Sequence, residues 1–105
     1  MKNLTLHFTD ESIWLQGRAL WERDCETLFS IERQAGKFKE IHVDIEYMSC
    51  CFSKALYIFL SRLGNANIYW HIRDPFYVHA DLPVLFSEIS GLPIKLIPGT
   101  SLAMK

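Results

Sequence analysis

Apolar and polar residues alternate in several short stretches of the chain. The alternation runs from Leu4 to Phe8, and Ile13-Trp14-Leu15 resumes it shortly before Gly17. A period of two is typical of a half-buried strand, so residues 3–17 predict an N-terminal hairpin whose second strand ends at Gly17. Three further strands are predicted by the same pattern at residues 41–45, 68–72 and 94–97.

Helical periods separate the later strands. Residues 21–35 carry apolar side chains at helical spacing, and Gly36 is expected to end that helix. A second helix is expected over residues 51–63, and a third from an N-cap at Asp81. The second helix has an apolar stripe formed by Phe52, Leu56, Phe59, Leu60 and Leu63. The order β-β-α-β-α-β-α-β predicts an α/β domain with a mostly parallel or mixed sheet and helices packed on one side.

The chain is long enough for one domain only. With 105 residues, half of them hydrophobic, it predicts a single packed domain over residues 1–97 and a C-terminal tail over 98–105. Large aromatic side chains are expected in its core, namely Trp14, Trp21, Phe29, Phe59 and Trp70.

The net charge and the cysteine content indicate which kinds of partner and cellular location to expect. Eleven basic and twelve acidic residues give a net charge of −1, so we expect no nucleic-acid or acidic-membrane partner. No stretch approaches the roughly 18 to 20 apolar residues of a membrane span, and the N-terminus lacks an apolar signal region. The three cysteines are an odd number with two adjacent, which favours reduced thiols and a cytoplasmic location.

Local motifs for catalysis or metal binding are weak. The four histidines, His7, His42, His71 and His79, never fall at ligand spacing within one predicted element, so neither a metal nor a cofactor is expected. Asp44 and Glu46 share one face of a predicted strand. They are either a carboxylate dyad or the polar end of a strand.

The stretch from Ile41 to Leu56 is the most informative. A strand runs into a turn of small and polar residues, and that turn opens a helix. Free N–H groups and the helix dipole at such a start stabilise an anion, including a phosphorylated hydroxyl. The alternative is that Ser49 is only the N-cap of the helix.

At this turn the sequence resembles the SiaC-type regulatory phosphoproteins, small bacterial proteins with a fold like the STAS domains of anti-sigma-factor antagonists. Their approximate pattern, L-E-Y-F-N-T-S-S-S-K-A-L, is matched here at Glu46, Tyr47, Ser53, Lys54, Ala55 and Leu56. Softer matches are Gly17 and Glu22 upstream, and Ile68-Tyr69-Trp70-His71 and Gly91-Leu92-Pro93-Ile94 downstream. The resemblance covers nearly the whole chain in the same order.

The resemblance implies a non-enzymatic switch protein. In that family a kinase phosphorylates a Thr at the turn and a PP2C-type phosphatase removes the phosphate. One phosphorylation state binds and activates a diguanylate cyclase, which links the family to cyclic-di-GMP signalling and biofilm formation. We expect the regulatory region at Ser49, Cys50, Cys51 and Ser53. The expected partner-binding residues lie on the helix face that follows this turn and in the loop at residues 73–78, and they are Lys54, Tyr57, Ile58, Arg62, Phe76 and Tyr77.

Two departures from the family pattern keep alternatives open. The acceptor Thr is replaced by Cys50, so the switch is lost, or the acceptor is Ser49 or Ser53, or Cys50 is a redox switch. The family's acidic run is replaced by residues 73–84, where Phe76 and Tyr77 either bind a partner or pack on the core. A small enzyme or ligand binder using Cys50, Asp44 or Glu46, and a structural subunit that forms a homodimer, also stay open.

Overall fold

The computed structural model describes residues 3–62, 66–72 and 79–98. These residues form strands and helices in the order that the hydrophobic pattern predicts. The elements are β1 (Thr5–Phe8), β2 (Ser12–Ala19), α1 (Glu22–Ser30), the 3₁₀ helix η1 (Glu32–Lys37), β3 (Glu40–Met48), α2 (Cys50–Ser61), β4 (Asn67–Ile72), α3 (Leu82–Ser90) and β5 (Ile94–Pro98).

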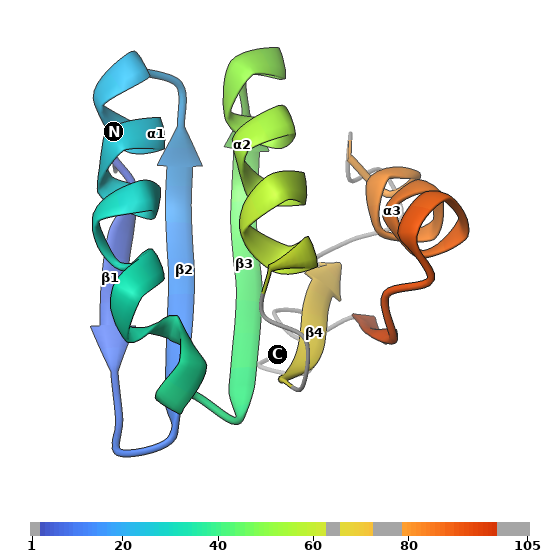
Figure 1. The fold of residues 1–105 in the computed structure, drawn as a ribbon. Coiled ribbons are helices and arrows are strands. Elements are labelled where there is room, and N and C mark those ends of the chain that lie inside the picture. Colours follow the sequence, from blue (N-terminus) through green and yellow to red (C-terminus); the bar gives the residue numbers. More distant parts are fainter. Residues whose placement is uncertain (1–2, 63–65, 73–78, 99–105) are drawn as a thin grey trace, which may run out of the picture.

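The strands form one mixed sheet with the spatial order β1-β2-β3-β4-β5. β1 pairs antiparallel with β2 through the predicted hairpin, and each later pair of neighbours is parallel. In Figure 1, α1 and α2 lie side by side in front of the sheet, and α3 lies beyond α2. The predicted α/β fold, with helices packed on one side of a mixed sheet, is confirmed.

The hydrophobic core lies between the helices and the sheet. Alternate residues of β2, β3 and β4 point toward the helices and are buried, as a period of two requires. They are Ile13, Leu15, Ile41, Val43, Ile45, Ile68 and Trp70. The predicted stripe of α2 packs on them through Phe52, Leu56, Phe59 and Leu60, while Leu63 lies outside the described residues.

β2 does not end at Gly17, as the sequence pattern predicts, but continues to Ala19. Its pairing with β3 shifts register between Gly17 and Arg18, as at a β-bulge. Gly17 has a φ of 106°, and a Cβ at this position would collide with the carbonyl oxygen of Asn3. Gly17 therefore permits both the backbone conformation of the bulge and the close approach of Asn3, and β2 continues beyond it.

The first helical segment also differs from the prediction. α1 ends at Ser30, and Gly36 lies inside η1 instead of marking the helix end. Three aromatic residues expected in the core lie outside it. Trp21 and Phe29 are 55% and 43% exposed, and Trp14 is half-buried on the other face of the sheet, where it stacks on His42. α1 buries only a narrow stripe against the core, so its apolar residues outside that stripe face solvent.

The predicted boundary at residue 97 stays a prediction. Pro98 is the last residue of β5, and residues 99–105 of the predicted tail lie outside the described residues.

Candidate functional site

The turn between β3 and α2 is held in place by Ser49. Its backbone N–H donates to the carbonyl oxygen of Ala19 at the end of β2, at 2.9 Å. Its Oγ accepts a hydrogen bond from the Phe52 N–H at 3.1 Å and so caps α2. Ser49 is thus the N-cap that the sequence offered as one interpretation, although a capping hydroxyl still carries a proton that a kinase could replace.

The other three residues of the predicted regulatory region gather on the first turn of α2. Cys50 and Cys51 are the first two helical residues, and both are exposed. The Ser53 side chain is half-buried, and its Oγ donates to the Cys50 carbonyl oxygen at 2.8 Å. This turn contains no acidic residue. The positive end of the helix dipole therefore has no compensating carboxylate from the first turn itself.

His79 connects the same turn to the segment that precedes α3. Its Nε2 accepts a hydrogen bond from the Met48 backbone N–H at 3.0 Å. Its ring also meets the Tyr47 ring edge-on, with centroids 5.2 Å apart. Partial burial lowers the pKa of His79 below its usual 6.5, which favours the neutral form that can accept this bond. The sequence pattern gave His79 no role because nothing local relates it to a residue 31 positions earlier.

The outer surface of α2 carries the predicted partner-binding residues, and their environments differ. Lys54 is exposed, and Ile58 is 40% exposed. Tyr57 is half-buried instead and packs on Phe86 of α3, with ring centroids 5.2 Å apart. Arg62 forms an ion pair with Glu32 of η1 at 2.7 Å. Lys54, Ile58 and Arg62 are therefore exposed, whereas Tyr57 is partly covered by α3.

The remaining predicted partner residues cannot be placed. Phe76 and Tyr77 lie outside the described residues, so their assignment stays a prediction.

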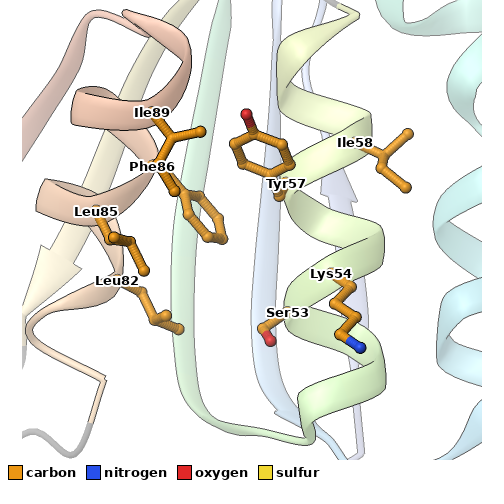
Figure 2. Close-up of a pocket in the computed structure, with 8 residues that line it drawn as sticks. All are labelled: Ser53, Lys54, Tyr57, Ile58, Leu82, Leu85, Phe86 and Ile89. Carbon is orange, nitrogen blue, oxygen red and sulfur yellow. The ribbon is translucent and has the colours of Figure 1, made fainter.

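A groove of about 450 Å³ runs between α2 and α3. Figure 2 shows Leu82, Phe86 and Ile89 of α3 pointing toward α2, which contributes Tyr57 to the same space. The full lining is Ser53, Lys54, Tyr57, Ile58, Leu82, Leu85, Phe86 and Ile89. The α3 residues were missed as site residues. A nine-residue helix whose only polar residues are Ser87, Glu88 and Ser90 has more apolar positions than one packed face needs, and this is a signal of a second buried or binding face.

The three cysteines have unequal environments. All are free thiols, with Cys50 and Cys51 exposed and Cys25 of α1 half-buried. Burial raises the pKa of Cys25, and negative charge on Cys51, Asp24 and Glu22 raises it further. Reactivity toward oxidants is therefore expected at α2 and not at α1.

Asp44 and Glu46 face away from the helices and are engaged in contacts with β2. The Asp44 carboxylate is buried and accepts a hydrogen bond from Gln16 Nε2 at 3.1 Å. Glu46 forms an ion pair with Arg18 at 2.8 Å. Both carboxylates project from the body of β3, whereas Cys50 lies on α2 beyond its end. The two carboxylates and the Cys50 thiol, which the sequence offered as alternative reactive groups, thus lie on different elements.

The same open face of the sheet carries a row of rings. The register aligns Trp14, His42 and Tyr69 across β2, β3 and β4. The Trp14 and His42 rings stack with centroids 4.0 Å apart, and His42 and Tyr69 stack at 4.9 Å. These contacts lie on the face of the sheet that the described helices leave open (Figure 1).

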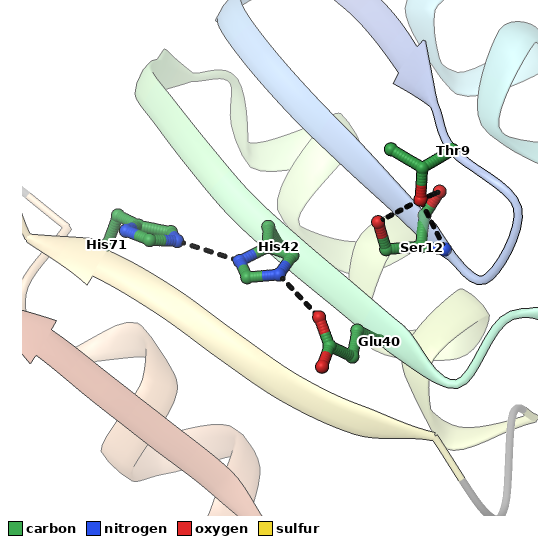
Figure 3. Close-up of polar contacts among 5 residues, drawn as sticks. All are labelled: Thr9, Ser12, Glu40, His42 and His71. Carbon is green, nitrogen blue, oxygen red and sulfur yellow. Dashed lines mark hydrogen bonds and ion pairs between the residues drawn. The ribbon is translucent and has the colours of Figure 1, made fainter.

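His42 also holds two polar contacts on this face, shown in Figure 3. Its Nδ1 lies 3.0 Å from Nε2 of His71, and its Nε2 lies 3.2 Å from Oε1 of Glu40. Within residues 3–62, 66–72 and 79–98, no three His, Cys, Asp or Glu side chains are grouped so that they could hold a metal ion. The histidines of the open face are instead part of its packing.

Comparison with known proteins agrees with this architecture. No protein-family model and no curated protein gives a significant match to the sequence. Two solved structures are similar over most of the chain. The chain has a SiaC-like fold. Apo-SiaC from Pseudomonas aeruginosa superimposes with a TM-score of 0.64 at 20% identity, covering 83% of this chain and 82% of that one. A second structure of SiaC from the same organism gives the same TM-score and identity over 93% and 99%.

The SiaC-like fold agrees with the predicted STAS-like architecture. Among the described helices, none has both the length and the apolar character needed to cross a membrane.

Proposed function

We propose that this protein is a non-enzymatic regulatory protein that acts by binding other proteins at the start of α2. The observation that carries the proposal is the exposed first turn of α2, with Cys50 and Cys51, directly beside an apolar groove. Exposed apolar side chains beside a polar turn are typical of a surface for protein recognition.

The resemblance to SiaC-type proteins supplies the proposed partners. They are a kinase, a PP2C-type phosphatase and a diguanylate cyclase, in cytoplasmic cyclic-di-GMP signalling that controls biofilm formation. The similarity in fold to SiaC supports this assignment. Cys50 stands at the position of the family's phospho-acceptor, and a thiol is no substrate for a Ser/Thr kinase. We therefore propose that the protein acts constitutively in its unphosphorylated form.

The physical mechanism is recognition of charge and shape at one turn. A phosphate there would add nearly two negative charges and three acceptor oxygens. In SiaC-type proteins this change would alter the surface that a partner contacts. With Cys50 in place of the acceptor, the turn keeps the charge and shape of the unmodified state unless Ser49 or Ser53 takes the phosphate.

The test is affinity capture from cells that naturally produce the protein. Wild type is compared with Lys54→Glu, which reverses a charge beside the turn, and with Lys39→Glu as the matched control. Lys39 is equally a lysine, forms an ion pair with Glu11, and precedes β3 at the end opposite to α2. Captured proteins are identified by mass spectrometry, and the bait is digested to locate modifications.

Capture of a diguanylate cyclase by wild type and by Lys39→Glu, but not by Lys54→Glu, would support the proposed binding surface. If the captured bait also has an unmodified turn, the protein acts constitutively in its unphosphorylated form. Phosphate on Ser49 or Ser53 would instead show a relocated acceptor and a working switch. If neither a cyclase nor a kinase is captured by wild type, the proposed function is wrong.

A second candidate function, a thiol redox sensor, is favoured by the exposure of Cys50 and Cys51. An exposed thiol can be reached and oxidised by a peroxide. Cells are treated with hydrogen peroxide and the captured bait is analysed for oxidised cysteine. Oxidation confined to Cys50 or Cys51, with loss of the partner, would favour this candidate over the constitutive form.

A further inference from the structure

α3 exposes more apolar surface than its packing requires. Of its residues Leu82–Ser90, only Pro83 and Phe86 are buried. Leu85 and Ile89 are 45% and 64% exposed, and both line the groove toward α2. Neighbouring exposed apolar side chains of this size mark an interaction site more often than isolated ones do.

The groove lies between two helices that do not pack closely on each other. α2 packs closely on α1, whereas its contact with α3 is concentrated at the edge-to-face pair of Tyr57 and Phe86. The α3 side of the groove repeats at i, i+3, i+4 and i+7 through Leu82, Leu85, Phe86 and Ile89, as Figure 2 shows. Such a stripe runs along the helix axis, and it is the kind of surface on which the apolar face of another amphipathic helix packs.

The charge of the groove restricts what can bind there. Lys54 is its one charged lining residue, and the other lining residues are apolar apart from Ser53 and the Tyr57 hydroxyl. Within the described part of the chain, Lys54 takes part in none of the ion pairs. An ammonium group beside an apolar groove is complementary to a carboxylate beside an apolar stripe.

We infer that the groove between α2 and α3 binds an amphipathic helix of a partner protein. The bound helix presents large aliphatic side chains at i, i+4 and i+7 to the groove, and a Glu or Asp to Lys54. This inference rests on the proposed function and names the chemistry of the partner. It also assigns Leu85 and Ile89, which the resemblance does not cover, to the binding surface.

The inference can be tested without knowing the natural partner. A display library of randomised helical peptides of about four turns is selected on the immobilised full chain. Selected peptides are then labelled with a fluorophore and titrated by fluorescence anisotropy against wild type, Ile89→Glu and Val84→Glu. Val84 is the matched control because it is also on α3 and 49% exposed, yet it does not line the groove. Circular dichroism checks that each variant is folded.

We expect the selected peptides to share the aliphatic i, i+4, i+7 spacing and at least one acidic residue. Ile89→Glu should weaken binding about tenfold or more, and Val84→Glu should leave it unchanged. Lys54→Glu should invert the charge preference, so that a Glu→Lys version of the peptide binds better than the original. The inference would be overturned if the selected peptides shared no common spacing of aliphatic residues. It would also be overturned if Ile89→Glu and Val84→Glu lost the same amount of peptide affinity.

Another occupant of the groove would also overturn it. If a second copy of the chain fills the groove, wild type will form a dimer in light scattering that Ile89→Glu disrupts. The proposed function fails separately, in the cell-capture experiment. A natural partner that is lost with Lys54→Glu but kept by Ile89→Glu would leave the proposed function standing and the groove inference wrong.

Discussion

The backbone N–H of Met48 donates to Nε2 of His79, with the two nitrogens 3.0 Å apart. Met48 is the last residue of β3, and the next residue caps α2. His79 lies shortly before α3, so one hydrogen bond links the strand end, the turn and the segment leading into the second wall of the groove. The bond requires an unprotonated Nε2, because a protonated one has no lone pair to accept it.

This geometry predicts a pH-dependent stability. Burial lowers the pKa of folded His79 below 6.5, so the unfolded chain binds a proton more readily than the folded one does. The stabilisation is complete above about pH 6.5 and is lost as the pH falls below that value toward the folded-state pKa. We expect urea-unfolding midpoints to fall more between pH 7.5 and 5.5 for wild type than for His79→Gln, which accepts a hydrogen bond without titrating.

A second substitution of His79 separates the contribution of the hydrogen bond to stability from the effect of protonating the imidazole. His79→Leu should destabilise the protein by about 1 to 3 kcal/mol at pH 7.5, because it leaves the buried Met48 N–H without its acceptor. If His79→Gln retains the full pH dependence of wild type, the titrating group is another residue.

The cap at Ser49 predicts a stability difference between three substitutions. Ser49→Ala removes the acceptor of the Phe52 N–H and should cost about 1 kcal/mol. Ser49→Asp and Ser49→Asn keep an acceptor and should remain within a few tenths of a kcal/mol of wild type. Chemical denaturation of the three variants measures this. Equal losses for all three would mean that the capping bond contributes nothing.

Substitution by alanine is predicted to lower the free energy of unfolding by different amounts at Gly17 and Gly91. Both have positive φ, at 106° and 71°. Gly17→Ala also drives a Cβ into the Asn3 carbonyl, whereas a Cβ at Gly91 meets open space. We expect Gly17→Ala to cost at least about 2 kcal/mol and Gly91→Ala about 1 kcal/mol, measured by thermal unfolding. The reverse order would contradict the tight approach of Asn3 to the bulge.

The order of the elements was predictable from sequence because each strand and helix has its own local period. The α2 stripe is an example, since the buried residues Phe52, Leu56 and Phe59 are those that the helical spacing selects. Gly17 shows where this reasoning fails. A glycine in a strand is locally compatible with an end or a bulge, and pairing with β3 decides between them.

The candidate site was only partly predictable, for a related reason. The turn that begins α2 is contiguous in sequence, so Ser49, Cys50 and Ser53 could be predicted together as candidate site residues. The groove requires Tyr57 and Phe86 to meet, and their contact depends on how α3 packs against the sheet. Tyr57 was therefore expected on the exposed side of α2, whereas it is half-buried against α3.

The three cysteine thiols are predicted to react with a thiol reagent at different rates. Cys50 and Cys51 are exposed, whereas Cys25 is half-buried and its pKa is raised by that burial and by nearby negative charge. With a thiol-specific chromogenic reagent at pH 7.5, we expect two fast equivalents and one slow one. Peptide mapping should assign the slow site to Cys25. The Cys25→Ser variant should lose only the slow phase, and a fast Cys25 would contradict the packing of α1 on α2.

The final prediction concerns how well the start of α2 accommodates negative charge. Cys50 is exposed at the first helical position, and the first turn of α2 contains no acidic residue. Cys50→Glu should therefore stabilise the protein by about 0.5 kcal/mol at low ionic strength, through the helix dipole. Cys50→Gln is the control because it has nearly the same shape without the charge. The difference in stability between the Glu and Gln variants should shrink in about 1 M salt, where the screening length is only about 3 Å.

A stabilisation that is equal for Glu and Gln would indicate helix propensity instead of the helix dipole. A destabilisation specific to Glu would mean that this turn does not favour an anion, and that a phosphate at the same position would be disfavoured as well.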